Sequence, residues 1–260
     1  MNAPEVRDLA PNKSTGRVPP AGFRLTLADL FRVTGLGVAI IGAAVLALGA
    51  LTLLGLGSVD PQRLSGSQAF VMAATVVQVA IMVGCVRLIG MRRRGMRWRD
   101  LGLTAPTRRW VWLSLAIALL CIPLISGVTA GFQLLLDHPI TSPQARLIAP
   151  EGFTWTGAVG MLLLAGLAAP FAEEIYFRGL LYGLLRRYWG VVASVAVSAL
   201  LFGAIHGILD VLPGTAVMGA VLAVAYERSG TLWVPVTIHA TYNSLSIILL
   251  FAALHAGLAS

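Results

Sequence analysis

Charged side chains are scarce in this 260-residue chain. They make up 12% of the residues, whereas apolar residues make up 57% and the mean hydropathy is +0.83. Ordinary soluble domains carry about 25% charged residues. So few charges could not cover the surface of a soluble fold of this size, which excludes a typical cytosolic enzyme and also a disordered or fibrous chain. We therefore expect an all-α, multi-pass membrane protein.

Cysteines are equally few: Cys85 and Cys121 both lie in apolar runs. Two such residues form no disulfide framework and no CxxC metal-binding motif, so we expect two buried thiols. The sequence also has no HExxH motif, no GxSxG elbow and no P-loop. Zincin, serine hydrolase and nucleotide-binding functions therefore have no support.

Long runs without Asp, Glu, Lys or Arg predict the membrane spans. A spanning helix needs about 20 residues. The runs are 33–59, 64–86, 110–136, 152–172, 188–209, 211–226 and 229–260. We expect a bundle of about seven transmembrane helices, in which 211–226 is the weakest span and the fourth helix continues to residue 185. Segment 137–156 is interpreted as a plain connector, with an ordered or partly re-entrant loop as the alternative.

The runs divide the chain into a cytoplasmic tail (1–32), three N-terminal helices (33–136) and a C-terminal core (157–250). Most of the 19 basic residues lie in the tail, in the loop 87–109 and near residues 186–187 and 228. Only Arg63 and Arg146 lie in the segments on the other side. Basic residues concentrate in cytoplasmic loops, so we expect a cell-membrane protein with a cytoplasmic N-terminus. Anionic membrane lipids then explain the net charge of +8 without a nucleic acid partner.

Ionisable residues inside the predicted spans are confined to the C-terminal half. The fourth helix contains Glu173, Glu174 and Arg178. Glu174 and Arg178 are four residues apart and share a helix face, so they can form an ion pair. Glu173 is rotated about 100° from Glu174 around the helix axis. One glutamate can therefore pair with Arg178 while the other points into a cavity.

Two later helices carry the remaining polar groups. Phe202 and His206 share one helix face, and His239 and Asn243 share another. A carboxylate sheltered in a cavity can act as a general base, while imidazole and amide groups can stabilise an oxyanion. Alternatively, Glu173, His206 and His239 match the ligands of a catalytic zinc with an open water position.

At these residues the sequence resembles the CPBP intramembrane proteases, which include the type 2 CAAX prenyl protease and bacterial Abi-like relatives. The matching motifs are EExxxR, FxxxH and HxxxN, in this order, and the resemblance covers about residues 157–250. It implies an endopeptidase that acts on a membrane-associated peptide or protein. Both a metal-free glutamate mechanism and a divalent metal such as zinc are compatible with it.

The resemblance also implies a role for each residue. Glu173 would activate water with assistance from His206, and His239 and Asn243 would stabilise the oxyanion. Glu174 and Arg178 would support the site, although a purely structural ion pair is an equal alternative.

Two other function classes remain open. A binding or immunity protein could use the same scaffold without catalysis and would tolerate glutamine at position 173. A small transporter or proton relay could use the glutamates and histidines for conduction, although the sequence has no inverted repeat.

Overall fold

The computed structural model describes residues 18–53 and 67–258, and helices dominate both segments without any β-strand. Six helical stretches are long and apolar enough to cross a membrane: 27–47, 68–94, 108–135, 155–188, 209–229 and 233–255. The prediction of an all-α, multi-pass membrane protein is confirmed. Parts of the predicted tail (1–17), the end of the first span and the beginning of the second lie outside the described residues.

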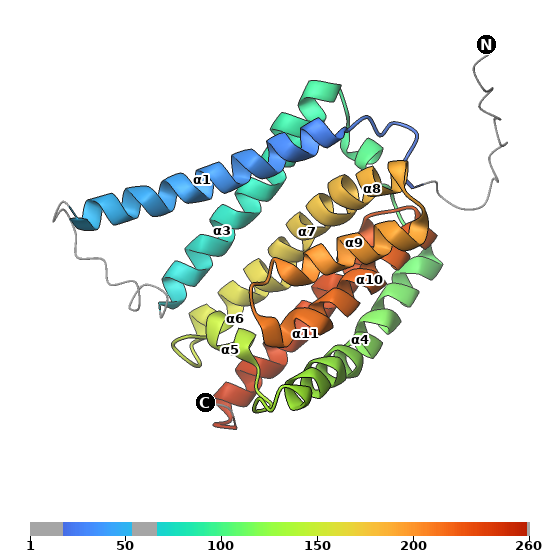
Figure 1. Ribbon diagram of the computed structural model, residues 1–260. Coiled ribbons are helices and arrows are strands. Elements are labelled where there is room, and N and C mark those ends of the chain that lie inside the picture. The colour runs from blue at the N-terminus through green and yellow to red at the C-terminus, as the bar shows by residue number, and fades with distance from the viewer. Residues whose placement is uncertain (1–17, 54–66, 259–260) are drawn as a thin grey trace, which may run out of the picture.

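The helices surround one long central rod. The rod runs from residue 155 to residue 188 and consists of α6 (Trp155–Met161), η4 (Leu162–Ala168), α7 (Ala169–Glu174), η5 (Ile175–Tyr182) and α8 (Gly183–Tyr188). The pair α1 (Leu27–Leu53) and α3 (Gln68–Cys85) lies on one side of it. On the other side lie α4 (Arg108–Leu135), α9 (Val191–Ala204), α10 (Leu212–Ser229) and α11 (Trp233–His255). Figure 1 shows this arrangement.

Helix α9 is shorter than the fifth predicted span, 188–209. It has 14 residues, which at about 1.5 Å per residue is about 21 Å, well below a bilayer core of about 30 Å. The helix ends at Ala204, and Gly207 takes a positive φ of 67° in the turn that follows. A run without charges cannot reveal such an end, because the turn is built from uncharged residues. The sixth span, expected to be the weakest, is instead a 21-residue stretch, 209–229.

A buried cluster closes the bundle at the end where α8 and α10 terminate. After α3, the chain continues through η1 (Val86–Met91) and η2 (Arg92–Arg94) to η3 (Trp98–Leu101). Leu101 is fully buried, and its carbonyl accepts a hydrogen bond of 3.1 Å from Tyr226 Oη. The Leu232 amide donates to the carbonyl of Gly102 at 2.8 Å. This loop is therefore packed against the bundle.

Part of the predicted tail is packed as well. Phe23 and Leu25 are buried, and α1 begins at Leu27. Asp29, in the first turn of α1, accepts a hydrogen bond from Arg94 Nε at 2.8 Å. This ion pair, in which the carboxylate is buried and the Arg94 side chain is partly exposed, connects the first helix to the arginine-rich loop. The two cysteines are free and buried, as predicted.

Candidate active site

The predicted glutamates lie on a helix with unusual turns. Helix α7 is flanked by two π-helical segments, η4 and η5. Pro170, in the first turn of α7, has no backbone N–H and cannot make the i to i−4 hydrogen bond of a regular helix. The wider turn of η4 accommodates this proline. Turns of this kind occur frequently at functional sites, because they re-aim side chains and carbonyl groups.

Glu174 connects two helices through a single carboxylate oxygen. Its Oε1 accepts a hydrogen bond of 2.7 Å from Arg178 Nη1, as their spacing predicts. The same oxygen lies 2.9 Å from His239 Nδ1. Arg178 Nη2 also donates to the carbonyl of Gly219 on α10 at 2.9 Å. All three side chains are buried, so this cluster fixes α7, α10 and α11 relative to one another.

Glu173 points in a different direction from Glu174 and lines a cavity. Its Oε2 lies 3.8 Å from His239 Nε2, and 12% of its side chain is exposed. The two nitrogens of His239 thus face two different carboxylates, one fully buried and one in the cavity. The rotation between adjacent helical residues produces this division.

His206 lies just beyond the end of α9. Its Nδ1 is 2.8 Å from the carbonyl oxygen of Phe202. This carbonyl belongs to the last turn of α9, where carbonyl groups have no following turn to bind them. A carbonyl can only accept, so Nδ1 carries the proton and the neutral ring keeps its lone pair on Nε2. The Phe202 ring packs edge-on against His206 and His239, at centroid distances of 5.2 and 5.6 Å.

Asn243 contacts the π-helical segment of the rod. Its Nδ2 donates to the carbonyl of Ala165 in η4 at 3.1 Å. An amide nitrogen carries two N–H groups, so this bond holds the side chain while the second N–H can bind another acceptor. Ser244 makes a parallel bond to the carbonyl of Gly166 at 3.3 Å.

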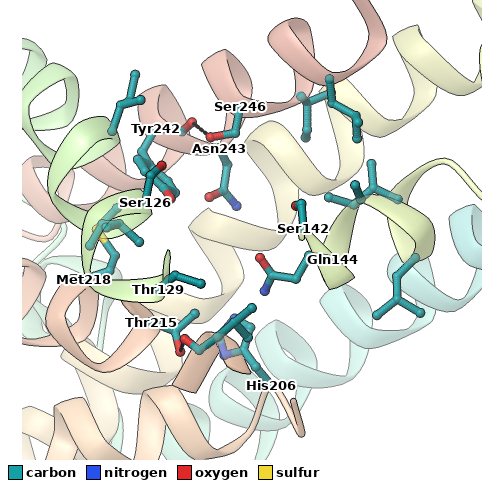
Figure 2. A pocket seen from close by; sticks show the side chains of 18 of the residues that line it. Ser126, Thr129, Ser142, Gln144, His206, Thr215, Met218, Tyr242, Asn243 and Ser246 are labelled. Atoms are coloured by element: carbon teal, nitrogen blue, oxygen red, sulfur yellow. Dashed lines mark hydrogen bonds between the residues drawn. The ribbon is translucent and has the colours of Figure 1, made fainter. Parts of the chain in front are cut away.

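One cavity of about 730 Å³ brings four of the predicted residues together: Glu173, His206, His239 and Asn243 all line it. They come from α7, the end of α9 and α11, and Figure 2 shows the cavity with His206 and Asn243 on opposite walls. Glu174 and Arg178 are not lining residues and lie behind the wall.

Sequence reasoning missed several neutral polar groups in the cavity wall. Ser126, Thr129 and Gln133 of α4 contribute to it, as does Thr215 of α10. Thr129 and Gln133 follow Ser126 by three and seven residues, so the three form a polar stripe on an otherwise apolar helix. This spacing could have predicted a polar cavity wall from the sequence.

The segment 137–156 also proves to be more than a plain connector. It contains the short helix α5 (Pro143–Ile148), and Ser142 and Gln144 line the cavity. Figure 2 shows the Gln144 side chain directed into the cavity between Asn243 and His206. The Ile148 carbonyl accepts a 3.1 Å hydrogen bond from Gln68 Nε2, which fixes α5 against α3. The alternative of an ordered loop describes this segment better.

The zinc alternative finds little support in the geometry. Within residues 18–53 and 67–258, no three His, Cys, Asp or Glu side chains lie close enough together to hold a metal ion. Glu173, His206 and His239 share a cavity but do not form a compact ligand set. The fit to a catalytic zinc is therefore poor.

Comparison with known proteins finds a family match in the C-terminal half of the chain. Residues 155–245 match the family model described as "Type II CAAX prenyl endopeptidase Rce1-like". The resemblance expected from the three motifs is confirmed: this segment of the multi-pass membrane protein is similar to an Rce1-like domain. It includes the whole central rod, α9, α10 and the catalytic candidates of α11.

A curated relative points the same way. "Putative membrane peptidase YdiL" from Bacillus subtilis (strain 168) is 29% identical over 89 residues, which cover 34% of this chain. The matched region spans only 36% of that relative's length. No solved structure matches the chain.

Proposed function

We propose that this protein is an intramembrane endopeptidase that hydrolyses a peptide bond of a membrane-associated substrate with a water molecule activated by Glu173. The observation that carries the proposal is the convergence of Glu173, His206, His239 and Asn243 on one cavity inside an Rce1-like domain. Four such residues from three helices exceed what helix packing requires. The peptide substrate is membrane-associated, and we propose a cytoplasmic N-terminus.

The first chemical step uses Glu173 as the general base. Its carboxylate accepts a proton from water, and the water oxygen attacks the carbonyl carbon of the scissile bond. The lone pair on His206 Nε2 accepts the second hydrogen of the same water and orients it. The bond from His206 Nδ1 to Phe202 supports this role, because it fixes both the tautomer and the ring.

The second requirement is stabilisation of the oxyanion. The second N–H of Asn243 is available for this oxygen, since the first is bound to Ala165. His239 Nδ1 lies 2.9 Å from the Glu174 carboxylate, and Nε2 can donate to the oxyanion only in the form of the ring that carries a proton on both nitrogens. Collapse of the tetrahedral intermediate breaks the C–N bond, and the proton held by Glu173 passes to the leaving amine.

The test is a comparison of Glu173→Gln with the wild type. Glutamine keeps the shape of the side chain but cannot accept the proton, so proteolysis should fall by more than the about 10²–10⁴-fold attributed to a general base. New peptide termini in native membranes, measured by mass spectrometry, report the activity, and the inactive variant serves to trap substrates. Glu151→Gln is the matched control, because it makes the same change at an exposed position outside the cavity. Equal cleavage by Glu173→Gln and wild type would refute the proposal and favour a binding protein.

A further inference from the structure

The cavity lies at one end of the bundle. It is lined by the second half of α4, from Ile122 to Gln133, and by the middle of α11, from His239 to Leu250. Val211, directly before α10, and the first two turns of α10, as far as Met218, form another wall. All three stretches point toward the end of the molecule at which α5 lies (Figure 1).

The rim of the cavity is accessible and carries polar side chains beside the apolar Ile140 and Leu147. Thr141 and Ser142 are exposed, and Gln144 is half-buried. His138 Nδ1 lies 2.9 Å from Asp210 Oδ1, which joins the loop after α4 to the turn before α10. This contact and α5 frame the mouth, through which a peptide can reach His206 and Glu173.

At the opposite end, the residues that the structure describes form a buried cluster. Leu101, Tyr182 and Tyr226 are fully buried there and pack in one cluster with Phe23 and Leu25. The hydrogen bonds from Tyr226 to Leu101 and from Leu232 to Gly102 bind the loop after η2 to this cluster. The bundle is therefore closed at this end by well-packed side chains.

The two ends also differ in charge. The closed end carries most of the described arginines: Arg92, Arg93, Arg94, Arg97, Arg99, Arg108, Arg109, Arg186, Arg187 and Arg228. The cavity end carries Arg146 together with Asp137, Glu151 and Asp210. Arginine-rich loops remain in the cytoplasm during membrane insertion. The closed end is thus the cytoplasmic one.

We infer that the cavity opens to the extracytoplasmic side of the membrane, so that its substrate is an exported or outward-facing segment of a membrane-associated protein. That the cavity receives a substrate rests on the proposed function. The side of the membrane to which the cavity opens rests on the closed arginine-rich end and on the open rim at α5. A protein whose cleavable segment stays in the cytoplasm does not reach Glu173.

Cysteine labelling tests the sidedness directly. In a background with Cys85→Ala and Cys121→Ala, single cysteines are introduced as Ser142→Cys at the rim and Arg97→Cys in the arginine-rich loop. Both positions are exposed, so neither change disturbs the core. A charged, membrane-impermeant maleimide should label Ser142→Cys in right-side-out vesicles and Arg97→Cys only in inside-out vesicles. The reverse pattern would overturn the inference.

Proteolysis in the same vesicles separates the two proposals. Modification of Ser142→Cys from outside by a bulky maleimide should reduce cleavage at least tenfold, while modification of Arg97→Cys should leave it unchanged. If Glu173→Gln is inactive but Ser142→Cys reacts only in inside-out vesicles, the sidedness is wrong and the proposed function stands. If Ser142→Cys reacts from outside while Glu173→Gln cleaves normally, the proposed function is wrong and the sidedness stands.

Discussion

His239 and Glu174 meet through a 2.9 Å contact between Nδ1 and the carboxylate oxygen that also binds Arg178. The contact joins α11 to α7. It orients the imidazole so that Nε2 faces Glu173 and the cavity. A buried carboxylate thus orients a cavity residue without lining the cavity itself. The consequences can be measured separately for stability and for catalysis.

The Glu174–Arg178 pair should be strongly coupled. Arg178→Met or Glu174→Met alone leaves a buried charge without its partner and should lower the free energy of unfolding by about 3–5 kcal/mol. The double variant Glu174→Met/Arg178→Met should lose clearly less than the sum of the single changes. Unfolding in detergent, followed for all four proteins, gives the double-mutant cycle. Additive losses would mean that the pair does not act as a unit.

Asn243→Ala should reduce kcat by about 10²–10³-fold with little change in KM, the size expected for one oxyanion donor. Ser244→Ala is a suitable control, because Ser244 makes a similar bond to the same π-helical segment but does not line the cavity. The two variants should have similar stability and very different kcat values. A comparable loss of kcat in both would assign the effect to the packing of η4.

Removal of metal should leave activity intact. The cavity residues do not form a compact ligand set, so we expect proteolysis to continue in a strong chelator, and purified protein to lack stoichiometric zinc in elemental analysis. Loss of activity in the chelator, with recovery on addition of zinc, would instead make His206 and His239 metal ligands.

Gly102→Ala should destabilise the closed end of the bundle. Gly102 has a φ of 106°, and an added Cβ would collide with the hydroxyl of Tyr226. Gly95→Ala is the control, since Gly95 also has a positive φ, of 63°, but open space around its Cβ position. The control should cost about 1 kcal/mol and Gly102→Ala more, because only the second adds a clash to the backbone strain. Thermal unfolding of both variants measures the difference, and equal costs would exclude a role for the clash.

The sequence was most informative about polar residues that lie on the same helix, because their spacing shows which of them share a face. The four-residue spacing of Glu174 and Arg178 predicts their ion pair, and the alternation of Glu173 and Glu174 predicts that they face different surroundings. Contacts between helices could not be predicted in the same way. The bond from His239 to Glu174 depends on how α11 crosses α7, which no spacing within one helix reveals.

Backbone irregularities account for most of the other differences between the prediction from the sequence and the structure. The end of α9 at Ala204 and the ordered loop around α5 are formed by uncharged residues, so a search for gaps between charges does not detect them. Pro170 was a visible signal of an irregular helix, but the position and width of the π-helical turns depend on packing against α3 and α11. The polar stripe of Ser126, Thr129 and Gln133 was readable and was overlooked among stronger ionisable signals.

The shortness of α9 has a consequence for the surrounding lipid. Val192 and Leu200 are exposed on this helix, and Ile205 is exposed just after it, yet the helix is long enough for only about two thirds of an average bilayer core. A short apolar segment draws the nearby lipid inward, which thins the bilayer locally at a modest energetic cost. His206 lies two residues beyond the end of this helix and lines the cavity, so the thinned region lies close to the cavity and brings interfacial water closer to it. The length of the lipid acyl chains should therefore affect the rate of proteolysis, and turnover should decrease as the acyl chains of the vesicle lipids are lengthened.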